Sequence, residues 1–512
     1  MGAENIRAAV VGAGIGGLCA ALELAASGAR VTIFERADYP GGRMREIRAG
    51  AGAVDAGPTV LTMRWIFEDI FARTGPSLES VLETDALEVL ARHAWAGPAT
   101  LDLYSDVARS TDAIGEFAGP DEARGYRAFA ERARRAYELL DPIFLQKPTP
   151  SLTGLMAFPS PSRLLTLWRS GPFSTLWKAV GTHFRDPRLQ QLFARYATYC
   201  GSSPFLAPAT LMLIAHVEQL GVWSVRGGMQ RLAEALAARV HSCGGQLEFG
   251  KEVRRVRVER GRVHSLELAD GRSEGFDLVI ANTEPWAVAA GYLGEDVRTA
   301  CGAATSPRPS LSAVTWTCRA RVDGWPLARH NVFFSDDYPT EFATLQGGRY
   351  PTDPTIYLCA QDRPTPEHAL TDDSERVFML MNAPARSAPA AAPAALETVA
   401  MRRLARAGIT LTPDPETLVR TTPEDFAARF PGSGGALYGM ATHGWRAAFA
   451  RRGASTRVRG FYLAGGGVHP GAGVPMAALS GRYAAAQALS EVGHGASLSV
   501  NLPRTRRAVT TS

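Results

Sequence analysis

The chain has 512 residues, 46% of them hydrophobic and 21% charged, a composition that excludes a disordered protein and indicates a globular one with more than one structural unit. The net charge of +5 is small for this length, and there is neither zinc-finger spacing nor a basic region with heptads, so we expect no nucleic-acid partner. The six cysteines are scattered without a C-x-x-C pair, which argues against a metal site or a disulfide framework and favours a cytoplasmic location.

The first forty residues predict a β-α-β unit. Residues 6–11 form a short apolar run typical of a strand, residues 18–27 are good helix formers, and residues 31–34 form a second apolar run. Gly28 ends the predicted helix. No stretch of about 18 residues is free of charges and helix breakers, so we expect no helix that spans a membrane.

A glycine motif lies between the first strand and the helix. Gly12 permits a tight turn, Gly14 lets the backbone approach a pyrophosphate, and Gly17 lets the helix pack on the strand. The start of the helix then offers unpaired N–H groups to a diphosphate. Glu35 ends the second strand, where its carboxylate suits the ribose hydroxyls of an adenosine. The unit therefore predicts a dinucleotide site.

Two further elements favour FAD over NAD as that dinucleotide. Gly42 and Arg43 follow Glu35 closely, and an arginine behind glycines can reach a pyrophosphate from the side. The turn Gly57-Pro58-Thr59 offers small groups where a flavin ring needs room. An NAD-binding domain has no need of either element.

The rest of the chain is predicted to alternate between helical and β-rich segments. Residues 110–225 are largely helical in pattern, and residues 245–280 read as short strands with hairpin signals. Residues 310–385 are mixed, with strands predicted at 313–318 and 355–359, and residues 461–490 read as strand, glycine loop and helix.

Both ends of the chain resemble one family. The run VVGAGIGGLCAALELAASGARVTIFERADYPGGRMRE (10–46) is similar to the start of the flavin amine oxidase and phytoene desaturase superfamily, and residues 460–481 resemble the C-terminal signature of bacterial carotenoid desaturases. The resemblance implies that the loop with Gly466 passes the flavin of an FAD cofactor. It also implies that the helix beginning near Val474 and Met476 points its positive end at the flavin, and that the backbone at Val253 contacts the adenine.

The fold class implied is α/β, with a discontinuous Rossmann-like FAD-binding domain and a substrate domain of mixed antiparallel sheet and helices. We assign residues 1–70, 226–300 and 455–495 to the FAD-binding domain, residues 71–225 and 301–454 to the substrate domain, and residues 496–512 to a flexible tail.

The middle of the chain resembles carotenoid desaturases. Residues 354–363, which end in Cys-Ala-Gln-Asp-Arg, are similar to the 1-hydroxycarotenoid 3,4-desaturase branch, also called hydroxyneurosporene or methoxyneurosporene desaturases. This implies removal of a hydride and a proton from C-3,4 of an acyclic C40 carotenoid, with oxygen or a quinone as the electron acceptor. A phytoene or neurosporene desaturase, an amine or protoporphyrinogen oxidase, and a non-enzymatic prenyl-binding protein like the GDP-dissociation inhibitors stay open as alternatives.

No catalytic residue stands out from the sequence. Asp141, Glu341 and Asp362 are candidate proton acceptors, and His330 and His469 invite the same interpretation, but each suits a structural role as well. Residues 152–180 mix aromatic and basic side chains with apolar ones, which favours either a peripheral membrane contact or a core helix.

Overall fold

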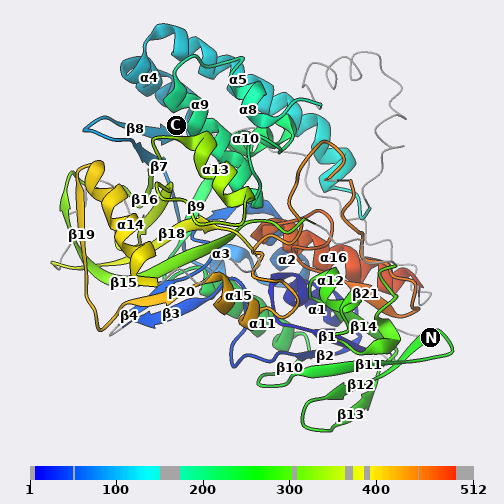
Figure 1. Ribbon diagram of the computed structural model, residues 1–512. Coiled ribbons are helices and arrows are strands. Elements are labelled where there is room, and N and C mark those ends of the chain that lie inside the picture. The colour runs from blue at the N-terminus through cyan, green and yellow to red at the C-terminus, as the bar shows by residue number, and fades with distance from the viewer. Residues whose placement is uncertain are drawn as a thin grey trace, which may run out of the picture.

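The structure is a computed structural model that describes residues 6–49, 52–149, 173–302, 308–363, 373–385, 393–447 and 449–491. A parallel sheet with its helices lies on one side of the molecule, and a larger, mostly antiparallel sheet lies on the other (Figure 1). The predicted tail at 496–512 and most of the 152–180 segment lie outside the described residues.

The parallel sheet has five strands in the order β10-β2-β1-β14-β21, and its members come from distant parts of the chain. All of its strands except β10, at the edge, are mainly apolar, because helices cover one face of the sheet and a small antiparallel sheet covers the other. The five strands are β1 (Arg7–Val11), β2 (Arg30–Phe34), β10 (Gln246–Glu248), β14 (Leu278–Ala281) and β21 (Phe461–Leu463). The small sheet consists of β11 (Val253–Glu259), β12 (Arg262–Leu268) and β13 (Ser273–Gly275).

The helices that pack on the parallel sheet come from both the first and the last parts of the chain. They are α1 (Ile15–Ala26), α2 (Trp65–Thr74), α3 (Leu78–Val81), α11 (Gln230–Ser242) and α16 (Val474–Glu491). The prediction for α1 was wrong at its start, since the helix begins directly after Gly14 rather than at residue 18. Gly16 and Gly17 belong to its first turn, where their lack of side chains permits close packing that outweighs their low helix propensity.

The larger sheet has the order β19-β15-β18-β17-β16-β7-β8, with β20 beside β15. Helix α14 (Pro393–Arg406) packs on one face through an apolar core, and the other face turns toward the interior. The strand predicted at 313–318 is longer, because β15 pairs first with β18 and then with β19. The strands are β7 (Val89–Ala94), β8 (Thr100–Tyr104), β15 (Ser312–Gly324), β16 (His330–Phe333), β17 (Ile356–Ala360), β18 (Glu375–Ala383), β19 (Ile409–Pro413) and β20 (Val419–Thr421).

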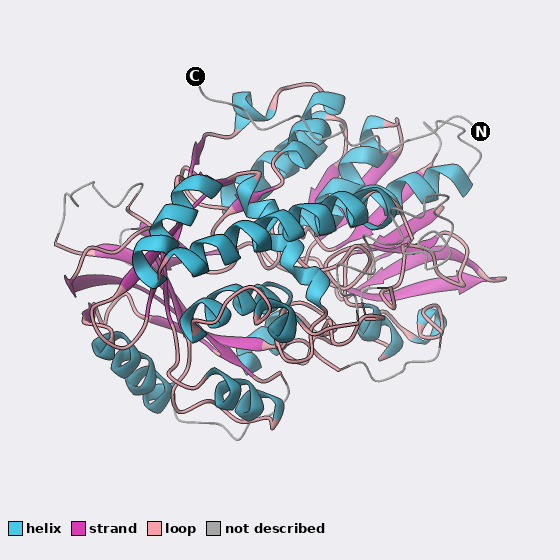
Figure 2. Ribbon diagram, turned by 90° about the horizontal axis from the view of Figure 1, so that it is seen from above, coloured by secondary structure: helices cyan, strands magenta, loops and turns pink. Residues whose placement is uncertain are grey.

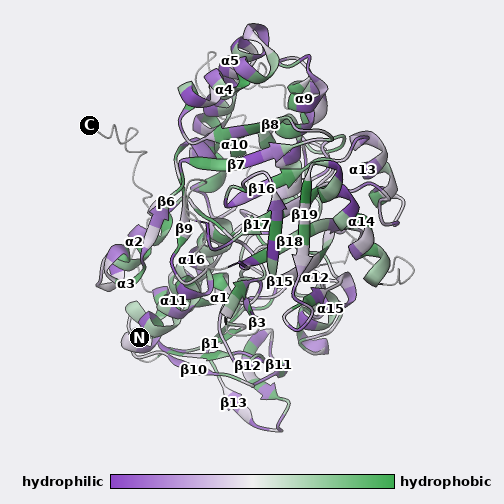
Figure 3. Ribbon diagram, turned by 90° about the vertical axis from the view of Figure 1, so that its left-hand side faces the viewer, coloured by the Kyte–Doolittle hydropathy of each residue, from purple (hydrophilic) through white to green (hydrophobic). Residues whose placement is uncertain are grey.

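A helical layer lies across the molecule between the strands at its two ends (Figure 2). Its longest member, α5 (Pro120–Leu140), buries residues three or four apart, such as Tyr126, Phe129, Ala133 and Tyr137, so one face packs inward. Figure 3 shows the matching mixture of polar and apolar colour on α5. The layer also contains α4 (Val107–Ala118), η2 (Asp141–Leu145), α8 (Leu176–Val180), α9 (Pro187–Ala194), η3 (Arg195–Cys200), η4 (Ala209–Met212), α10 (Leu213–Gln219) and α13 (Tyr338–Gln346).

Short elements complete the fold. They are β3 (Glu46–Ala49), β4 (Gly52–Asp55), β5 (Leu61–Thr62), β6 (Thr84–Ala86), β9 (Val222–Val225), α12 (Pro285–Ala289), η5 (Glu295–Val297) and α15 (Pro423–Arg429). Within the described ranges, none of the helices combines the length and the apolar character that crossing a bilayer requires.

Candidate active site

A cavity of about 910 Å³ begins where β1, β2, β14 and β21 end and continues to the larger sheet. All the predicted cofactor residues except Gly17 line it. These residues are Gly12, Gly14, Glu35, Gly42, Arg43, Gly57, Pro58, Thr59, Val253, Gly466, Val474 and Met476. Gly17 lies beneath the cavity in α1, where an added Cβ would come within 2.0 Å of the Gly12 carbonyl oxygen.

Gly12 and Gly14 form one wall of the cavity, which we call the glycine cradle. Gly12 has φ +98°, which other residues rarely adopt, and a Cβ on Gly14 would lie 2.6 Å from the Asn282 side-chain nitrogen. Helix α1 begins at the next residue, with no side-chain cap and no acidic residue in its first turn. Its N-terminal N–H groups are therefore suited to a diphosphate.

Glu35 is held in place by the backbone at the end of β2. Its two carboxylate oxygens accept hydrogen bonds from the N–H of Ala13 at 2.7 Å and of Ala37 at 2.8 Å. A carboxylate has further lone pairs, so Glu35 can accept from ribose hydroxyls as well.

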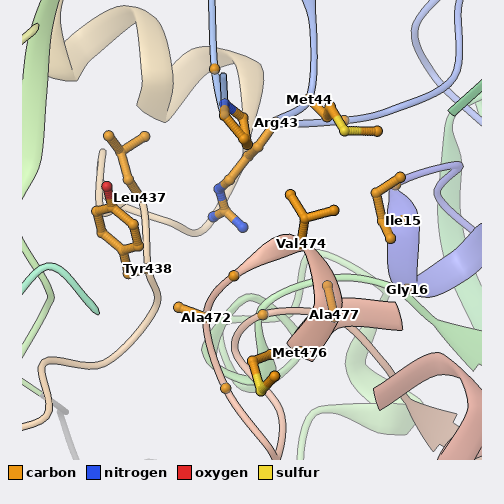
Figure 4. A pocket seen from close by; sticks show the side chains of 18 of the residues that line it. Ile15, Gly16, Arg43, Met44, Leu437, Tyr438, Ala472, Val474, Met476 and Ala477 are labelled. Carbon is orange, nitrogen blue, oxygen red and sulfur yellow. The ribbon is translucent and has the colours of Figure 1, made fainter. Parts of the chain in front are cut away.

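Arg43 reaches into the cavity from the segment after β2. Its Nη2 lies 2.9 Å from Glu284 Oε1, and its guanidinium carbon lies 5.1 Å from the centre of the Phe430 ring. The Arg43 Nε atom is buried and has no hydrogen-bond partner in the described part of the chain. Figure 4 shows the side chain extending toward Val474 at the start of α16, with Tyr438 beside it. A bound anionic group would complete this arrangement.

The start of α16 forms the opposite wall. Val474 and Met476 line the cavity, and the first turn of this helix of 18 residues has no acidic side chain. The positive end of the helix dipole therefore meets the cavity and favours negative charge there.

Two residues of this site were missed by the sequence reasoning. Asn282 follows β14 and contacts the glycines of both loops, since its side chain lies within 3 Å of the Cβ positions of Gly14, Gly16 and Gly465. Glu284 is 7% exposed and pairs with Arg43. The available signal was their position directly after an apolar strand of a parallel sheet, where ligand crevices form.

These features fit FAD. The glycine cradle and the start of α1 suit a diphosphate, and Glu35 suits a ribose. The unpaired Arg43 Nε and the start of α16 suit the negatively charged edge of a ring system.

The candidate proton acceptors differ in position. Asp141 lines the cavity and accepts a hydrogen bond from Gln146, and burial raises its pKa. Glu341 and Asp362 are not among the lining residues. Glu341 accepts from Ser335 Oγ and Thr355 Oγ1 at 2.8 and 2.7 Å, and Asp362 pairs with Arg376 at 2.6 Å. Because both carboxylates lie outside the lining and bind other side chains, we assign them structural roles.

The two candidate histidines are buried and neutral. His330 lines the cavity, its Nδ1 lies 2.7 Å from the Tyr357 hydroxyl, and burial lowers its pKa to about 3. His469 lies outside the lining, and burial lowers its pKa to about 4. Its Nε2 donates to the carbonyl oxygens of Phe144 and Lys147 at 3.0 and 2.9 Å, so it fastens the C-terminal loop to η2.

Comparison with known proteins places this site in a family. The family of flavin-containing amine oxidoreductases matches residues 15–489. The chain is 47% identical over 485 residues to a hydroxyneurosporene desaturase of Rubrivivax gelatinosus, covering 94% of this chain and 92% of that protein. It is 41% identical over 486 residues to a hydroxyneurosporene desaturase of Rhodobacter capsulatus, covering 94% and 97%.

Solved structures agree in fold. Putrescine oxidase bound to putrescine matches with a TM-score of 0.60 at 12% identity, and cyclohexylamine oxidase of Brevibacterium oxydans with 0.57 at 16%, each covering 95% of this chain and 99% of the other. The chain therefore belongs to the flavin-containing amine oxidoreductases and, within them, to the carotenoid desaturases of the hydroxyneurosporene desaturase type, as an oxidoreductase that uses FAD.

Proposed function

We propose that this enzyme desaturates the C-3,4 bond of an acyclic C40 carotenoid that carries a 1-hydroxyl group. The hydroxyneurosporene desaturases at 41–47% identity support this substrate class. A 1-hydroxycarotenoid 3,4-desaturase of Flavobacterium sp., 26% identical over 490 residues, supports the position of the new double bond.

The observation that carries the proposal is the continuity of the cavity. The space that begins at the glycine cradle runs on between α10 and the larger sheet, and the side chains there are mainly apolar. Leu213, Ile214 and Val217 form one wall, and Val332, Phe378 and Leu380 form the other. Two apolar walls suit a long hydrocarbon, whereas a small amine needs no such length.

When bound, FAD supplies the acceptor for a hydride from C-4 of the substrate. The apolar walls fix the polyene so that this allylic C–H bond faces the cofactor, and they exclude water from the reacting carbons. The positive charge left on the substrate spreads over the conjugated chain, so the protein needs no carboxylate to stabilise it. The proton from C-3 leaves to a side chain of the cavity, and Asp141 is among the carboxyl groups that line it.

The proposal also covers where the enzyme meets its substrate and which molecule finally accepts the electrons. Because a C40 carotenoid resides in the bilayer, we assign the enzyme to the cytoplasmic face of a membrane, where residues 152–180 hold it. We assign oxygen or a quinone as the final electron acceptor. In a vesicle-flotation assay, deletion of residues 155–172 should abolish flotation, and the deletion ends there because Leu176 in α8 is buried in the core. Intact membrane association and activity in the deleted protein would contradict this assignment.

Anaerobic addition of a 1-hydroxycarotenoid to the oxidised holoenzyme tests the reaction. The flavin absorbance at about 450 nm should bleach, and the product should carry a new double bond at C-3,4. An unchanged spectrum with this substrate, together with bleaching by phytoene, would indicate the rival phytoene desaturase. Peroxide formation with amines and no carotenoid product would indicate an amine oxidase.

A further inference from the structure

Three polar side chains interrupt the apolar cavity at one place. Arg195 and Tyr199 belong to η3, Glu218 belongs to α10, and all three line the cavity. Tyr199 is 38% exposed although it lies in the interior of the helical layer, because its ring forms part of the cavity wall. We refer to Arg195, Tyr199 and Glu218 as the polar triplet.

The charges of the polar triplet are incompletely matched by the protein. In the described part of the chain neither Arg195 nor Glu218 has an ion-pair partner within 4 Å. Arg195 Nη1 donates to the Tyr199 hydroxyl at 3.3 Å, and Glu218 Oε2 accepts from Tyr196 at 2.7 Å. A guanidinium and a carboxyl in an apolar wall cost free energy unless a further hydrogen-bonding group meets them. A pure hydrocarbon substrate offers no such group.

The surroundings of Glu218 act on its carboxyl group in two opposite ways. Burial raises its pKa, and the hydroxyls of Tyr196 and Tyr199 and the charge of Arg195 oppose that rise. Whether ionised or protonated, the carboxyl keeps an oxygen that can accept a hydrogen bond.

Tyr357 lies between Arg195 of the polar triplet and the turn that we assign to the flavin ring. The hydroxyl of Thr59, in that turn, lies 2.7 Å from the hydroxyl of Tyr357. The Arg195 guanidinium carbon in turn lies 5.6 Å from the centre of the Tyr357 ring. In a 1-hydroxycarotenoid only C-2 separates the hydroxyl-bearing carbon from the C-3,4 bond, so the hydroxyl must also lie near the flavin.

We propose that the polar triplet binds the 1-hydroxyl group of the substrate, with Glu218 accepting a hydrogen bond from it, Arg195 donating to its oxygen, and Tyr199 holding these two side chains in place through its own hydroxyl. This inference rests on the proposed function. The apolar walls bind the polyene of any carotenoid, whereas the polar triplet selects the oxygenated end and sets which bond faces the cofactor. The three residues are specificity-determining, since the chemistry itself does not pass through them.

Asp141, another of the carboxyl groups that line the cavity, suits this role less well. Asp141 is already bonded to Gln146, and it lies at the end of α5, on η2. It carries no contact to Thr59 or Tyr357 among the described interactions.

The test compares three substrates that share one polyene: a 1-hydroxycarotenoid, its 1-methoxy ether and the carotene without oxygen. For each variant, anaerobic flavin bleaching gives the rate of reduction, and titration of the carotenoid absorbance gives the dissociation constant. Glu218→Leu should lower the preference for hydroxyl over methoxy about tenfold or more, because only the hydroxyl donates to the carboxyl. Arg195→Met and Tyr199→Phe should lower the preference for both oxygenated substrates over the carotene by a similar factor.

Two further variants keep the test decisive. Tyr338→Phe removes a buried tyrosine hydroxyl that is not in the cavity lining and has no partner in the described structure, and it should leave all three preferences unchanged. Glu218→Gln replaces Glu218→Leu if the latter does not retain FAD, and it should reduce the same preference to a smaller extent.

The outcomes separate this inference from the proposed function. If the wild-type enzyme forms the C-3,4 product and the variants keep its substrate preferences, the role of the polar triplet is refuted. An equal fall in rate with all three substrates would also refute it, since that pattern indicates a general catalytic or structural role. If the wild-type enzyme forms no C-3,4 product at all, the proposed function fails instead.

Discussion

Gly481 in α16 lies directly against Gly16 in α1. A Cβ built on Gly481 would come within 2.0 Å of the Gly16 carbonyl oxygen and 3.0 Å of the Ala20 nitrogen. Gly16 in turn faces Gly465, whose backbone nitrogen lies 2.9 Å from a Cβ placed on Gly16. Three glycines therefore bring the first and last parts of the chain together beside the cofactor cavity.

Replacement of Gly481 by alanine should separate α1 from α16 and weaken FAD binding. We expect a loss of about 3 kcal/mol in the free energy of unfolding, because the added methyl group meets backbone that cannot yield. Urea unfolding and the ratio of flavin to protein absorbance measure the two effects. Gly115→Ala, in α4, is the control, since its Cβ would meet only Ala123 at an ordinary 3.4 Å. Full FAD content in Gly481→Ala would contradict the importance of this contact.

The cofactor side of the cavity could be predicted because its determinants are local. Gly12, Gly14 and Glu35 belong to one β-α-β unit, and each has a backbone or charge requirement that few residue types satisfy. The positions of Val474 and Met476 followed from a resemblance rather than from such a requirement.

The substrate side could not be predicted in the same way. Arg195 and Glu218 come together only because η3 and α10 pack side by side in the helical layer, and their sequence surroundings resemble those of ordinary helices. Asn282 gave only a weak signal, since its contacts with Gly14 and Gly465 depend on the order of strands in the sheet. Pairings that depend on topology leave no fixed spacing in a sequence.

Glu35→Ala should weaken FAD binding by roughly ten- to a hundredfold, the cost of losing charge-assisted hydrogen bonds to the ribose. Equilibrium titration of the apoprotein with FAD, followed by flavin fluorescence, measures the change. Glu248 ends the adjacent strand β10, pairs with Arg272 and does not line the cavity, so Glu248→Ala is the matched control and should keep wild-type affinity. Equal losses in both variants would show that Glu35 acts on the fold alone.

Glu341→Ala should destabilise the protein without changing turnover of the folded holoenzyme. The substitution leaves the hydroxyls of Ser335 and Thr355 and the Thr355 N–H without their acceptor, which costs about 3 kcal/mol. Chemical unfolding and the rate of flavin reduction per bound FAD measure the two quantities separately. Glu341→Gln, which keeps an acceptor oxygen, should be less destabilised. A loss of reduction rate in a stable Glu341→Gln enzyme would return this residue to the catalytic candidates.

His93 is buried in β7 and does not line the large cavity, although it borders a small space beside Arg195. Burial lowers its pKa from 6.5 to about 3, and its Nδ1 donates to the Leu101 carbonyl oxygen at 3.1 Å. The unfolded chain takes up a proton at this histidine near pH 6.5, whereas the folded protein does not until about pH 3. The contribution of His93 to stability is therefore present above pH 6.5 and is lost as the pH falls.

His93→Gln keeps a side-chain donor but removes the titration. Between about pH 6 and 4 the wild-type protein should lose stability relative to this variant by about 1.4 kcal/mol per pH unit. Between pH 7 and 9 the difference between the two proteins should stay constant, since neither state of either protein then changes protonation at this position. Urea unfolding curves measured across both ranges check the slope. Parallel curves below pH 6 would mean that the folded protein protonates His93 as readily as the unfolded chain does, which its burial against the Phe334 ring, at 6.0 Å between centres, should prevent.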